Sequence, residues 1–306
     1  MLENKYSVII PHYTQDGNID DLNRLVASIP DIESIQVLIV DNSIKPIASD
    51  LYKERKNTEI LYSPNERYAG GARNVGMEHA SGKWLLFADA DDYFTDNAFD
   101  VFNEYYESDA DVIYFCADGI YPETGEKSSS ADLYTNLVKG YLKDNTKEMD
   151  IRISFHVPWA KMVKKDFAIA GRYKYDEVIA NNDDYFAMLV GYYAKKILAV
   201  DKTVYYYTVT HGSLTKRRSY KVLSARLSVI LRKNKFLREH NLSKYQGSVM
   251  YLLHEIIKVG MVPFVKSIGQ IIRYHQNPFV GCSHWLKTFK TSQQLAKKNK
   301  QYITND

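Results

Sequence analysis

The chain has 306 residues, enough for one large domain or for one domain with an appended region, and it can bury a substantial core. Its two cysteines, Cys116 and Cys282, exclude a disulfide framework and a cysteine-rich metal site, and they favour a reducing compartment. The net charge of +3 is unevenly distributed along the chain. Residues 216–300 carry 18 Lys and Arg and two acids, whereas the other residues carry 22 Lys and Arg and 35 acids. This asymmetry marks a boundary near residue 215 and points to an anionic partner of the basic part.

A strand-like segment begins at Ser7, without the basic segment and the long apolar segment of a secretory signal. No uninterrupted apolar stretch reaches the roughly 18 residues that a spanning helix needs. We therefore expect a cytoplasmic protein without a membrane-spanning helix.

Residues 5–115 alternate short apolar runs with helical stretches. The predicted strands are residues 7–11, 37–41, 60–62, 84–88 and 111–116, and the predicted helices are 22–29, 47–56, 71–80 and 98–106. Strands this apolar, separated by helices, predict an α/β fold whose mostly parallel, Rossmann-like sheet carries helices on both faces. Further along, the pattern predicts a hairpin tip or loop at 119–132, helices at 133–149 and 184–195, a strand at 202–208, and two to four helices from about residue 220, including 223–239 and 247–259.

Three carboxylates, Asp89, Asp91 and Asp92, directly follow the apolar run 84–88. Burying such charges without partners is costly, so a plain core strand does not explain them. A divalent cation such as Mg²⁺ or Mn²⁺ is commonly held by one or two carboxylates together with substrate phosphates. An acidic turn that caps the next helix is the alternative, because Asp is a favourable N-cap residue.

Three predicted strands end in polar residues, at 11–13, 41–43 and 89–92. Ligands of open α/β sheets bind outside the carboxyl ends of the strands, so three such ends favour a nucleotide crevice. The connecting segment 65–76 has glycines that permit close backbone approach and arginines that can pair with phosphate. It matches neither the P-loop nor the dinucleotide fingerprint, and alone it predicts only a loop that enters a helix.

Four blocks, in this order and spacing, resemble the inverting family 2 glycosyltransferases of GT-A fold, of the type that builds bacterial polysaccharides. They are Ser-Val-Ile-Ile-Pro at 7–11, Val-Asp-Asn-Ser at 40–43, Ala-Arg-Asn-Val-Gly at 72–76 continuing to 80–83, and Phe-Ala-Asp-Ala-Asp-Asp at 87–92. The resemblance continues through 158–161 and 182–186 to 205–213. It implies a GT-A catalytic domain over residues 1–215, and it says little about the basic, helical C-terminal region 216–306.

The resemblance also implies roles in donor binding. Pro11 and Tyr13 are expected to line the nucleotide pocket. Asp41 is expected to bond the edge of the base, which in this family is most often uracil, and Arg73 is expected to lie near the nucleotide.

The family's Asp-x-Asp motif is matched by Asp89 and Asp91, which implies a bound Mn²⁺ or Mg²⁺. Asp91 is the expected metal ligand, and Asp89 is expected nearer the ribose or a water on the metal, with a share in the metal site. Asp92 extends the motif and is expected to cap or support it. His211 is a further candidate for the metal or diphosphate site, although a single histidine in a tyrosine-rich segment is more often structural.

At the start of the predicted helix 184–195 the family usually has Glu-Asp, and this chain has Asp183 and Asp184. The second acid of the pair is the family's usual catalytic base, which implies that role for Asp184. Asp183 is shorter than the usual Glu, a change that affects acceptor contacts or support of the base. Acids are also favoured at any helix N-terminus. Trp159 and Lys161 are expected on the acceptor side, although a tryptophan is often simply a core residue.

The implied reaction transfers a sugar from a nucleotide diphosphate-sugar, with UDP the expected nucleotide, to a hydroxyl of a glycan or lipid-linked glycan. Inversion at the sugar is the family expectation, and the residues themselves leave a retaining reaction open. They also leave open the donor sugar, the acceptor and the linkage.

The basic C-terminal region mixes Lys and Arg with apolar and aromatic residues, as in the segments 263–265, 278–280 and 284–286. A basic amphipathic surface of this kind favours peripheral attachment to an anionic membrane, beside a lipid-linked acceptor. A solvated basic appendage that packs on the catalytic domain, or that forms a homodimer, fits the same pattern.

Two other functions remain open on the residues alone. A sugar-phosphate nucleotidyltransferase also uses a metal-dependent α/β sheet, but it has no use for a base at Asp184. A non-catalytic nucleic-acid-binding protein would use the basic segment and the tyrosines, but it leaves the acidic first two thirds unexplained, so we expect no nucleic-acid partner.

Overall fold

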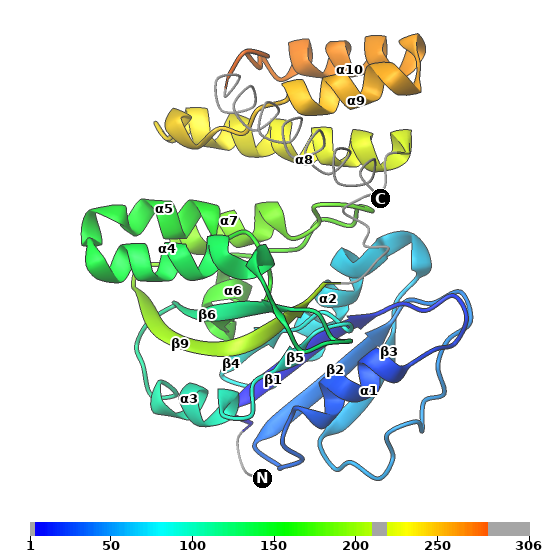
Figure 1. The fold of residues 1–306 in the computed structure, drawn as a ribbon, viewed down its shortest axis with the longest axis vertical. Coiled ribbons are helices and arrows are strands. Elements are labelled where there is room, and N and C mark those ends of the chain that lie inside the picture. The colour runs from blue at the N-terminus through cyan, green and yellow to red at the C-terminus, as the bar shows by residue number, and fades with distance from the viewer. Residues whose placement is uncertain (1–3, 210–218, 281–306) are drawn as a thin grey trace, which may run out of the picture. The chain divides into compact units, whose positions relative to one another are not determined.

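The computed structural model describes residues 4–209 and 219–280, and the chain divides into two compact units, residues 1–215 and 216–306 (Figure 1). The division falls at the boundary that the charge asymmetry marks. The two units are described separately below.

Within the described residues, nine strands of the first unit form one sheet. They are β1 (Tyr6–His12), β2 (Ile35–Asp41), β3 (Thr58–Tyr62), β4 (Trp84–Phe87), β5 (Tyr93–Phe94), β6 (Val112–Ile120), β7 (Lys127–Ser128), β8 (Lys161–Lys164) and β9 (Ile197–Thr208). The order is β3-β2-β1-β4-β8-β6-β9-β5, with β7 beside β6. The first four strands of this order are parallel, β8 is antiparallel to both its neighbours, β6 and β9 are parallel, and β5 is antiparallel to β9.

The helices of the first unit are α1 (Asp20–Ala27), α2 (Tyr68–His79), α3 (Ala98–Glu104), α4 (Asp132–Lys143), α5 (Glu148–Ser154), α6 (Lys165–Ala170) and α7 (Asp184–Tyr193). Helix α2 packs on β1 and β2, and α4 packs on β6 and β9. The close approach of α2 depends on Gly76, because a Cβ at this position would lie 2.4 Å from Cγ2 of Ile9.

Three of the four parallel strands, β1, β2 and β4, are buried along nearly their whole length, whereas β3 at the edge of the sheet has no buried residue. Every residue of β1 and β4 is buried, as are all but one in β2, which fits continuous apolar strands covered on both faces. In the register of the sheet, Val8 lies between Val37 and Leu86. The carboxyl ends of β1, β2 and β4 therefore meet at one edge.

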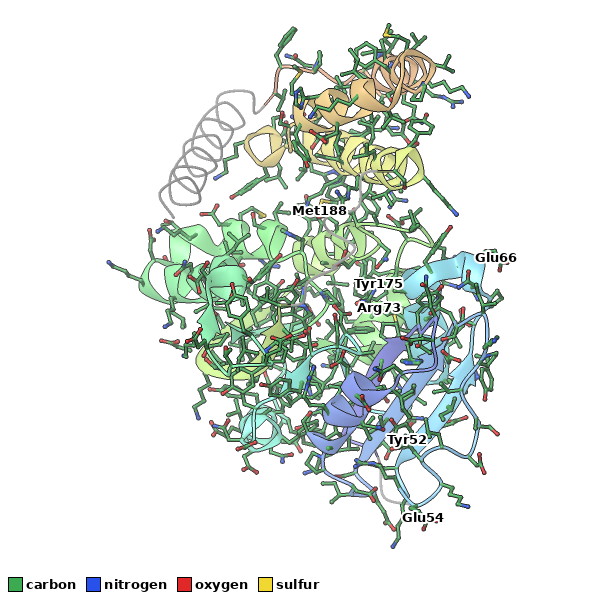
Figure 2. All side chains as sticks on the ribbon, turned by 45° about the vertical axis from the view of Figure 1, so that its right-hand side comes forward. Tyr52, Glu54, Glu66, Arg73, Tyr175 and Met188 are labelled. Carbon is green, nitrogen blue, oxygen red and sulfur yellow. The ribbon has the colours of Figure 1, made fainter. Side chains whose placement is uncertain are left out.

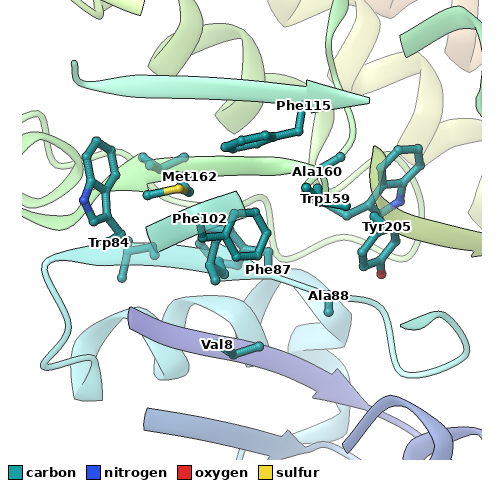
Figure 3. Close-up of a cluster of buried hydrophobic side chains, with 14 of the residues drawn as sticks. Val8, Trp84, Phe87, Ala88, Phe102, Phe115, Trp159, Ala160, Met162 and Tyr205 are labelled. Carbon is teal, nitrogen blue, oxygen red and sulfur yellow. The ribbon is translucent and has the colours of Figure 1, made fainter. Parts of the chain in front are cut away.

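Aromatic side chains from several elements fill the core of the first unit (Figure 3). Phe102 of α3 packs edge to face on Phe115 of β6, with ring centroids 5.2 Å apart. Trp159, just before β8, stacks on Tyr205 of β9 at 5.4 Å. These contacts join α3 to β6 and the segment before β8 to β9.

Most of the strands and helices predicted for residues 5–115 are confirmed, and so is the hairpin tip, which joins β6 to β7. The predicted helix 47–56 is wrong, because this segment forms successive turns such as the bond from the Leu51 amide to the Ala48 carbonyl. The predicted helix 133–149 ends as α4 at Lys143, because the Asp144 side chain caps a new short helix by accepting from the Thr146 amide. The strands β5 and β8 and the helix α6 were not predicted.

The second unit contains α8 (Tyr220–Glu239), α9 (Met250–Val259) and α10 (Met261–Arg273), which confirms the predicted helical region. Its small core is built from leucine and isoleucine side chains of the three helices, among them Leu227, Leu253 and Ile271. Asn234 of α8 fixes the connection to α9, because its side chain exchanges two hydrogen bonds of 2.8 Å with the backbone of Gly247. Among residues 4–209 and 219–280, no helix is both long and apolar enough to cross a bilayer.

Candidate active site

The carboxyl ends of β1, β2 and β4 bring together the polar residues that the sequence places after these strands. His12 lies opposite Asp41 in the register of β1 and β2, and the amide of Ala88, just after β4, donates to the carbonyl of Ile9. Three chain segments that are far apart in the sequence thus share one edge of the sheet. This is where α/β sheets bind their ligands.

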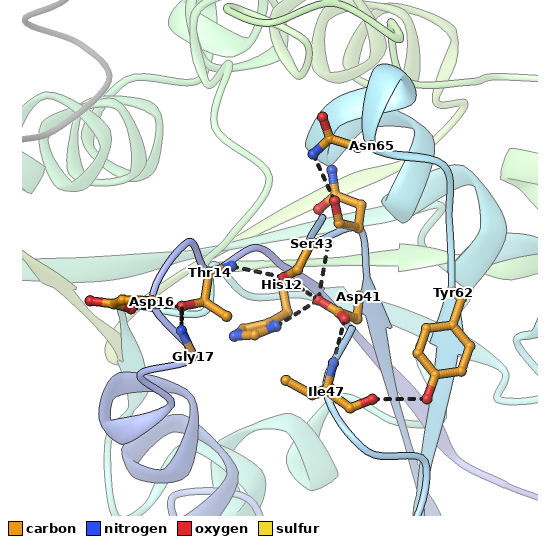
Figure 4. A network of polar contacts seen from close by, with 10 residues as sticks. His12, Thr14, Asp16, Gly17, Asp41, Ser43, Ile47, Tyr62 and Asn65 are labelled. Carbon is orange, nitrogen blue, oxygen red and sulfur yellow. Dashed lines mark hydrogen bonds and ion pairs between the residues drawn. The ribbon is translucent and has the colours of Figure 1, made fainter. Parts of the chain in front are cut away.

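Asp41 is the centre of a buried network at this edge (Figure 4). Its Oδ1 accepts from Nδ1 of His12 at 2.9 Å and from Oγ and the amide of Ser43 at 2.6 and 3.2 Å, and its Oδ2 accepts from the Ile47 amide at 2.9 Å. Burial alone would raise the pKa of Asp41, but these hydrogen bonds outweigh it and hold the pKa below its usual value. The ionised carboxylate therefore fixes the loop 42–47.

The three residues predicted at the nucleotide base lie in different surroundings. Tyr13 is 44% exposed at the end of β1, whereas Pro11 is buried within that strand. The side chain of Asp41 has no exposed surface, and a direct bond to a base edge requires that one of its present bonds is exchanged. The observed contacts give Asp41 a structural task, which is to hold the loop that borders the pocket.

Arg73 of α2 joins the end of β4 to the segment that precedes α7. Its guanidinium is nearly buried and donates through Nη2 to Oδ1 of Asp89 at 2.5 Å and through Nη1 to Oδ1 of Asn182 at 2.8 Å. The same group lies over the ring of Tyr175, 5.2 Å from its centroid, and Figure 2 shows the two residues next to each other. The Arg73 Nε is buried without a hydrogen-bond partner in the described structure, so one N–H donor of the guanidinium can bind a ligand or a water molecule.

Helix α2 can approach the 176–182 segment only because residue 70 is glycine. A Cβ on Gly70 would lie 1.8 Å from the carbonyl oxygen of Asp176 and 3.1 Å from Cβ of Asn182. The glycines of the 65–76 segment therefore serve helix packing beside the site, which agrees with the absence of a phosphate-loop fingerprint.

The three acids after β4 have separate surroundings. Asp92 is fully buried and its Oδ1 accepts from the Thr208 amide at 2.8 Å, so it supports the end of β9. Asp89 is partly exposed and paired with Arg73. Asp91 is exposed at its side chain, while its backbone carbonyl accepts from Arg24 at 2.6 Å.

The acidic motif carries more negative charge than its partners neutralise. Crowding by the surrounding protein, together with the Asp89 carboxylate, raises the pKa of Asp91 to about 6 although solvent reaches the side chain. Burial and both neighbouring acids also raise the pKa of Asp92. A bound cation would relieve this repulsion.

Within the residues that the structure describes, no three His, Cys, Asp or Glu side chains are grouped so that they alone could hold a metal ion. Two carboxylates that share a cation with substrate phosphates are, however, a common arrangement for Mg²⁺. Asp89 and Asp91 fit that donor set, because both offer hard oxygen ligands at the mouth of the sheet edge. The other candidate ligand, His211, lies outside the described residues.

Asp183 and Asp184 stand at the start of α7, on the other side of Arg73. Burial raises the pKa of Asp183, with Arg73 acting against the rise and Asp184 adding to it. His156 also lowers this pKa, and its Nε2 lies 2.9 Å from the Tyr134 hydroxyl. Nδ1 of His156 lies 2.9 Å from the Ser154 carbonyl, which can only accept, so this nitrogen is the donor of that hydrogen bond.

Trp159 and Lys161, predicted on the acceptor side, are both about 2% exposed. Trp159 packs against Tyr134 and Tyr205, so it shapes the site from within the core. Lys161 donates to the Phe155 carbonyl at 2.9 Å, and burial lowers its pKa to about 7 while Asp183 opposes the shift.

The buried Lys161 gives a testable dependence of stability on pH. The folded state has the lower pKa, so between about pH 7 and 10.5 the unfolded chain binds more protons and this lysine makes stability rise with pH. We expect Lys161→Met to be more stable than the wild type by about 1 kcal/mol near pH 6.5, since the cost of burying the charge exceeds that of the lost hydrogen bond. The advantage fades as the pH rises. Urea unfolding across this range measures it.

The matched control is Lys164→Met, a substitution on the same strand at a partly exposed lysine. It should leave the slope of stability against pH unchanged. A Lys161→Met variant whose slope equals that of the wild type contradicts the buried-lysine account.

Sequence reasoning missed several residues of the site because their types are common. His12, Asn182, Tyr175, Tyr205 and Tyr134 make their contacts with residues distant along the chain. The Tyr205 hydroxyl, for example, accepts from the Asp89 amide at 2.9 Å across 116 positions. The available signals were the polar strand end 11–13, the segments 182–186 and 205–213 of the resemblance, and the unusual number of tyrosines, 25 in all.

Comparison with known proteins finds a family model and relatives that are all described as glycosyltransferases. The family model described as Glycosyl transferase family 2 matches residues 7–172. The uncharacterized glycosyltransferase YibD of Escherichia coli (strain K12) is 25% identical over 224 residues, which cover 70% of this chain and 64% of YibD. The poly(ribitol-phosphate) beta-N-acetylglucosaminyltransferase TarS of Staphylococcus aureus (strain Mu50) is 33% identical over 94 residues, which cover 29% of this chain and 16% of TarS.

Among solved structures, residues 1–349 of S. aureus TarS in complex with UDP-GlcNAc superpose with a TM-score of 0.60 and 21% identity. The match covers 88% of this chain and 81% of that structure. The similarity shows the fold, which is the predicted GT-A arrangement of a mixed sheet flanked by helices, together with a helical C-terminal region.

Proposed function

The chain belongs to glycosyl transferase family 2, and from this premise we propose that it transfers a sugar from a nucleotide diphosphate-sugar to a hydroxyl of a glycan or lipid-linked glycan. That the protein is a glycosyltransferase follows from the family. We propose, beyond what the family shows, the identity of the donor and the acceptor, the use of a metal ion and the stereochemistry of the transfer.

The observation that carries the proposal is the position of Arg73. One guanidinium contacts Asp89 of the acidic motif and Asn182 beside the acids of α7, so the two halves of a transfer site meet at a single cation. In this arrangement Arg73 holds two parts of the site in place. The leaving diphosphate would lie near Asp89, and the base that takes the acceptor proton would lie at the start of α7. Such positioning is a large part of catalysis in group transfer.

We propose UDP as the donor nucleotide. TarS, whose fold this chain shares, was crystallised with UDP-GlcNAc, and the edge of the sheet offers the exposed Tyr13 and the loop that Asp41 holds. In this proposal Tyr13 lies against the base and Pro11 supports the wall of the pocket. Asp41 acts by fixing its loop, or contacts the base after one of its internal bonds is exchanged.

We propose Asp91, with a share from Asp89, as the residues that hold Mn²⁺ or Mg²⁺. The raised pKa of Asp91 supports this assignment, because burial and the Asp89 carboxylate both disfavour its charged form, which a bound cation would favour. When bound, such a cation supplies positive charge against the negative charge that develops on a leaving diphosphate. Arg73 places a second positive charge at the same end of the site.

We propose that the pair at the start of α7 supplies the base. The resemblance points to Asp184, and we propose the neighbouring Asp183 as the base because the charges of both Arg73 and Asp89 act on its carboxyl group. Its raised pKa also suits proton abstraction near neutral pH. The carboxylate takes the proton of the acceptor hydroxyl as the oxygen attacks the anomeric carbon, and attack opposite the diphosphate inverts the sugar.

The proposal includes a cytoplasmic enzyme of polysaccharide synthesis that meets a lipid-linked acceptor at a membrane surface. The low cysteine content and the basic C-terminal region support it. Neither the nucleotidyltransferase nor the nucleic-acid-binding alternative has support among the related proteins.

Thermal unfolding in a panel of nucleotide sugars, each with and without Mn²⁺, tests the proposal. A donor that binds only the folded chain raises the unfolding temperature, because at about 100-fold excess over Kd it adds roughly 2.7 kcal/mol. We expect UDP-sugars to stabilise the protein, and only when the metal is present. Equal melting temperatures across the panel contradict the proposed donor class.

A further inference from the structure

The outward face of α10 is apolar along much of its length. Met261, Val262, Val265 and Ile272 are between 62% and 67% exposed. The helical period groups these positions, together with Gly269, within about 100° around the helix, on a face that leaves out Ile271, which packs into the small core of the unit. Exposed apolar residues also lie next to the helix in the sequence, at Ile257, Val259 and Phe279.

Cations border this apolar face. Lys266 and Arg273 are seven residues apart on α10, so they lie on the same side about two turns from each other. Both are exposed, and within the described residues neither forms an ion pair. The sequence of α10, residues 261–273, contains no Asp or Glu.

A basic pocket adjoins the C-terminal end of the same helix. It has a volume of about 540 Å³ and is lined by Lys235, Arg238, Glu239, Arg273, Tyr274 and His275. Arg238 is anchored through bonds of 2.7 Å to the Tyr274 carbonyl and 2.6 Å to Oε1 of Gln276. Both partners are neutral, and the one carboxylate of the lining, Glu239, pairs with Nζ of Lys235 at 3.8 Å, so the positive charges of Arg238 and Arg273 can attract an anion. Arg273 belongs both to this pocket and to the border of the apolar face.

We propose that α10 and the adjoining pocket form a docking surface for an anionic lipid bilayer. The apolar face enters the boundary between headgroups and acyl chains, Lys266 and Arg273 lie among the headgroups, and the pocket receives a lipid phosphate. An apolar face bordered by cations and free of acids is the pattern of an interfacial helix. A soluble polyanion pairs with the cations but gives the apolar face no partner.

This inference deepens the proposed function, since it puts the enzyme beside a lipid-linked acceptor. It rests on different residues from the transfer site. Vesicle binding and sugar transfer to a soluble acceptor therefore succeed or fail independently.

Co-sedimentation with vesicles tests the surface, using the full chain and comparing phosphatidylglycerol-rich with pure phosphatidylcholine vesicles. We expect binding to the anionic vesicles at low salt, and weaker binding as salt screens the charges. Ile272→Glu should lower the partition coefficient about tenfold or more, because burial of one large apolar side chain is lost. Lys266→Gln with Arg273→Gln should lower it about 25-fold, since each cation near the surface contributes about fivefold.

The matched control is Leu142→Glu, which places the same charge on a 51% exposed leucine of α4. It should bind vesicles like the wild type. Excess inorganic phosphate should displace the protein no better than chloride of equal ionic strength, and specific displacement would reduce the site to a phosphate pocket and overturn the bilayer assignment. Absence of binding to anionic vesicles, wild-type binding by Ile272→Glu, or a dimer in sedimentation analysis that Ile272→Glu dissociates likewise overturns the proposal.

Discussion

Replacing Asp183 by asparagine should lower the turnover number of sugar transfer by about 10²–10⁴-fold, the usual contribution of a positioned general base. The amide keeps the shape of the side chain but cannot accept the acceptor proton. Donor affinity should stay near that of the wild type, because the change removes no contact that the nucleotide makes. Rapid-quench kinetics under single-turnover conditions separate the two quantities.

Stability distinguishes this loss from misfolding. Burial raises the pKa of Asp183 in the folded state, so the folded chain binds more protons than the unfolded chain and this residue makes stability rise as the pH falls. The neutral asparagine avoids the cost of the buried charge. We therefore expect Asp183→Asn to unfold at the same temperature as the wild type or higher near pH 7, and to lose this part of the pH dependence.

Asp184→Asn is the matched comparison, since it makes the same chemical change one residue along α7. If Asp183 is the base, Asp184→Asn should lose less than about tenfold in turnover. The opposite ranking assigns the base to Asp184, as the family resemblance alone suggests. Wild-type turnover in both variants would remove the base from this helix.

Replacing Asp91 by asparagine should lower transfer by about 10²-fold or more, because the proposed cation, which would offset the charge of the diphosphate, would lose its principal ligand. Calorimetric titration of UDP, with and without Mn²⁺, shows whether the loss of transfer comes from a lost metal ligand. Mn²⁺ should raise the affinity of the wild type for UDP, and this gain should largely disappear in Asp91→Asn.

Asp96→Asn is the control, because Asp96 is an exposed acid of the same segment outside the motif. It should retain both transfer and the metal effect. A Mn²⁺-dependent affinity that survives in Asp91→Asn would contradict the assigned ligand.

The parallel half of the fold was predictable because local pattern determines it. Residues 8–11 of β1, 37–40 of β2 and 84–87 of β4 are consecutive apolar residues, and such runs are typical of strands buried on both faces. The convergence of their polar ends then follows from the parallel geometry. The acidic motif and Asp41 were found for this reason.

The antiparallel half was less accessible to sequence reasoning. Strand β8 has only four residues, two of them lysines, and its assignment depends on pairing with β4 and β6 rather than on its own pattern. The same applies to the contacts that define the site. Arg73 donates a hydrogen bond to Asn182, which lies 109 positions further along the chain. The residues next to either side chain in the sequence do not predict this contact.

The side chains alone do not rank two neighbouring acids. Asp183 and Asp184 are chemically identical, the resemblance assigns the base to Asp184, and the effect of Arg73 and Asp89 on the pKa of Asp183 became visible only in the folded structure. Likewise, the composition of the C-terminal region indicated a basic amphipathic surface, but the choice of α10 depends on which of its residues the small core buries.

The most direct test of the account is an analysis of the products that the purified wild-type chain forms from a UDP-sugar and Mn²⁺. The account predicts free UDP together with sugar joined to an acceptor, or to water when no acceptor is supplied, and it predicts that a chelator stops the reaction. Release of pyrophosphate or formation of UTP would instead identify a nucleotidyltransferase. Transfer that continues undiminished in the presence of chelator would contradict the proposed metal site at Asp89 and Asp91.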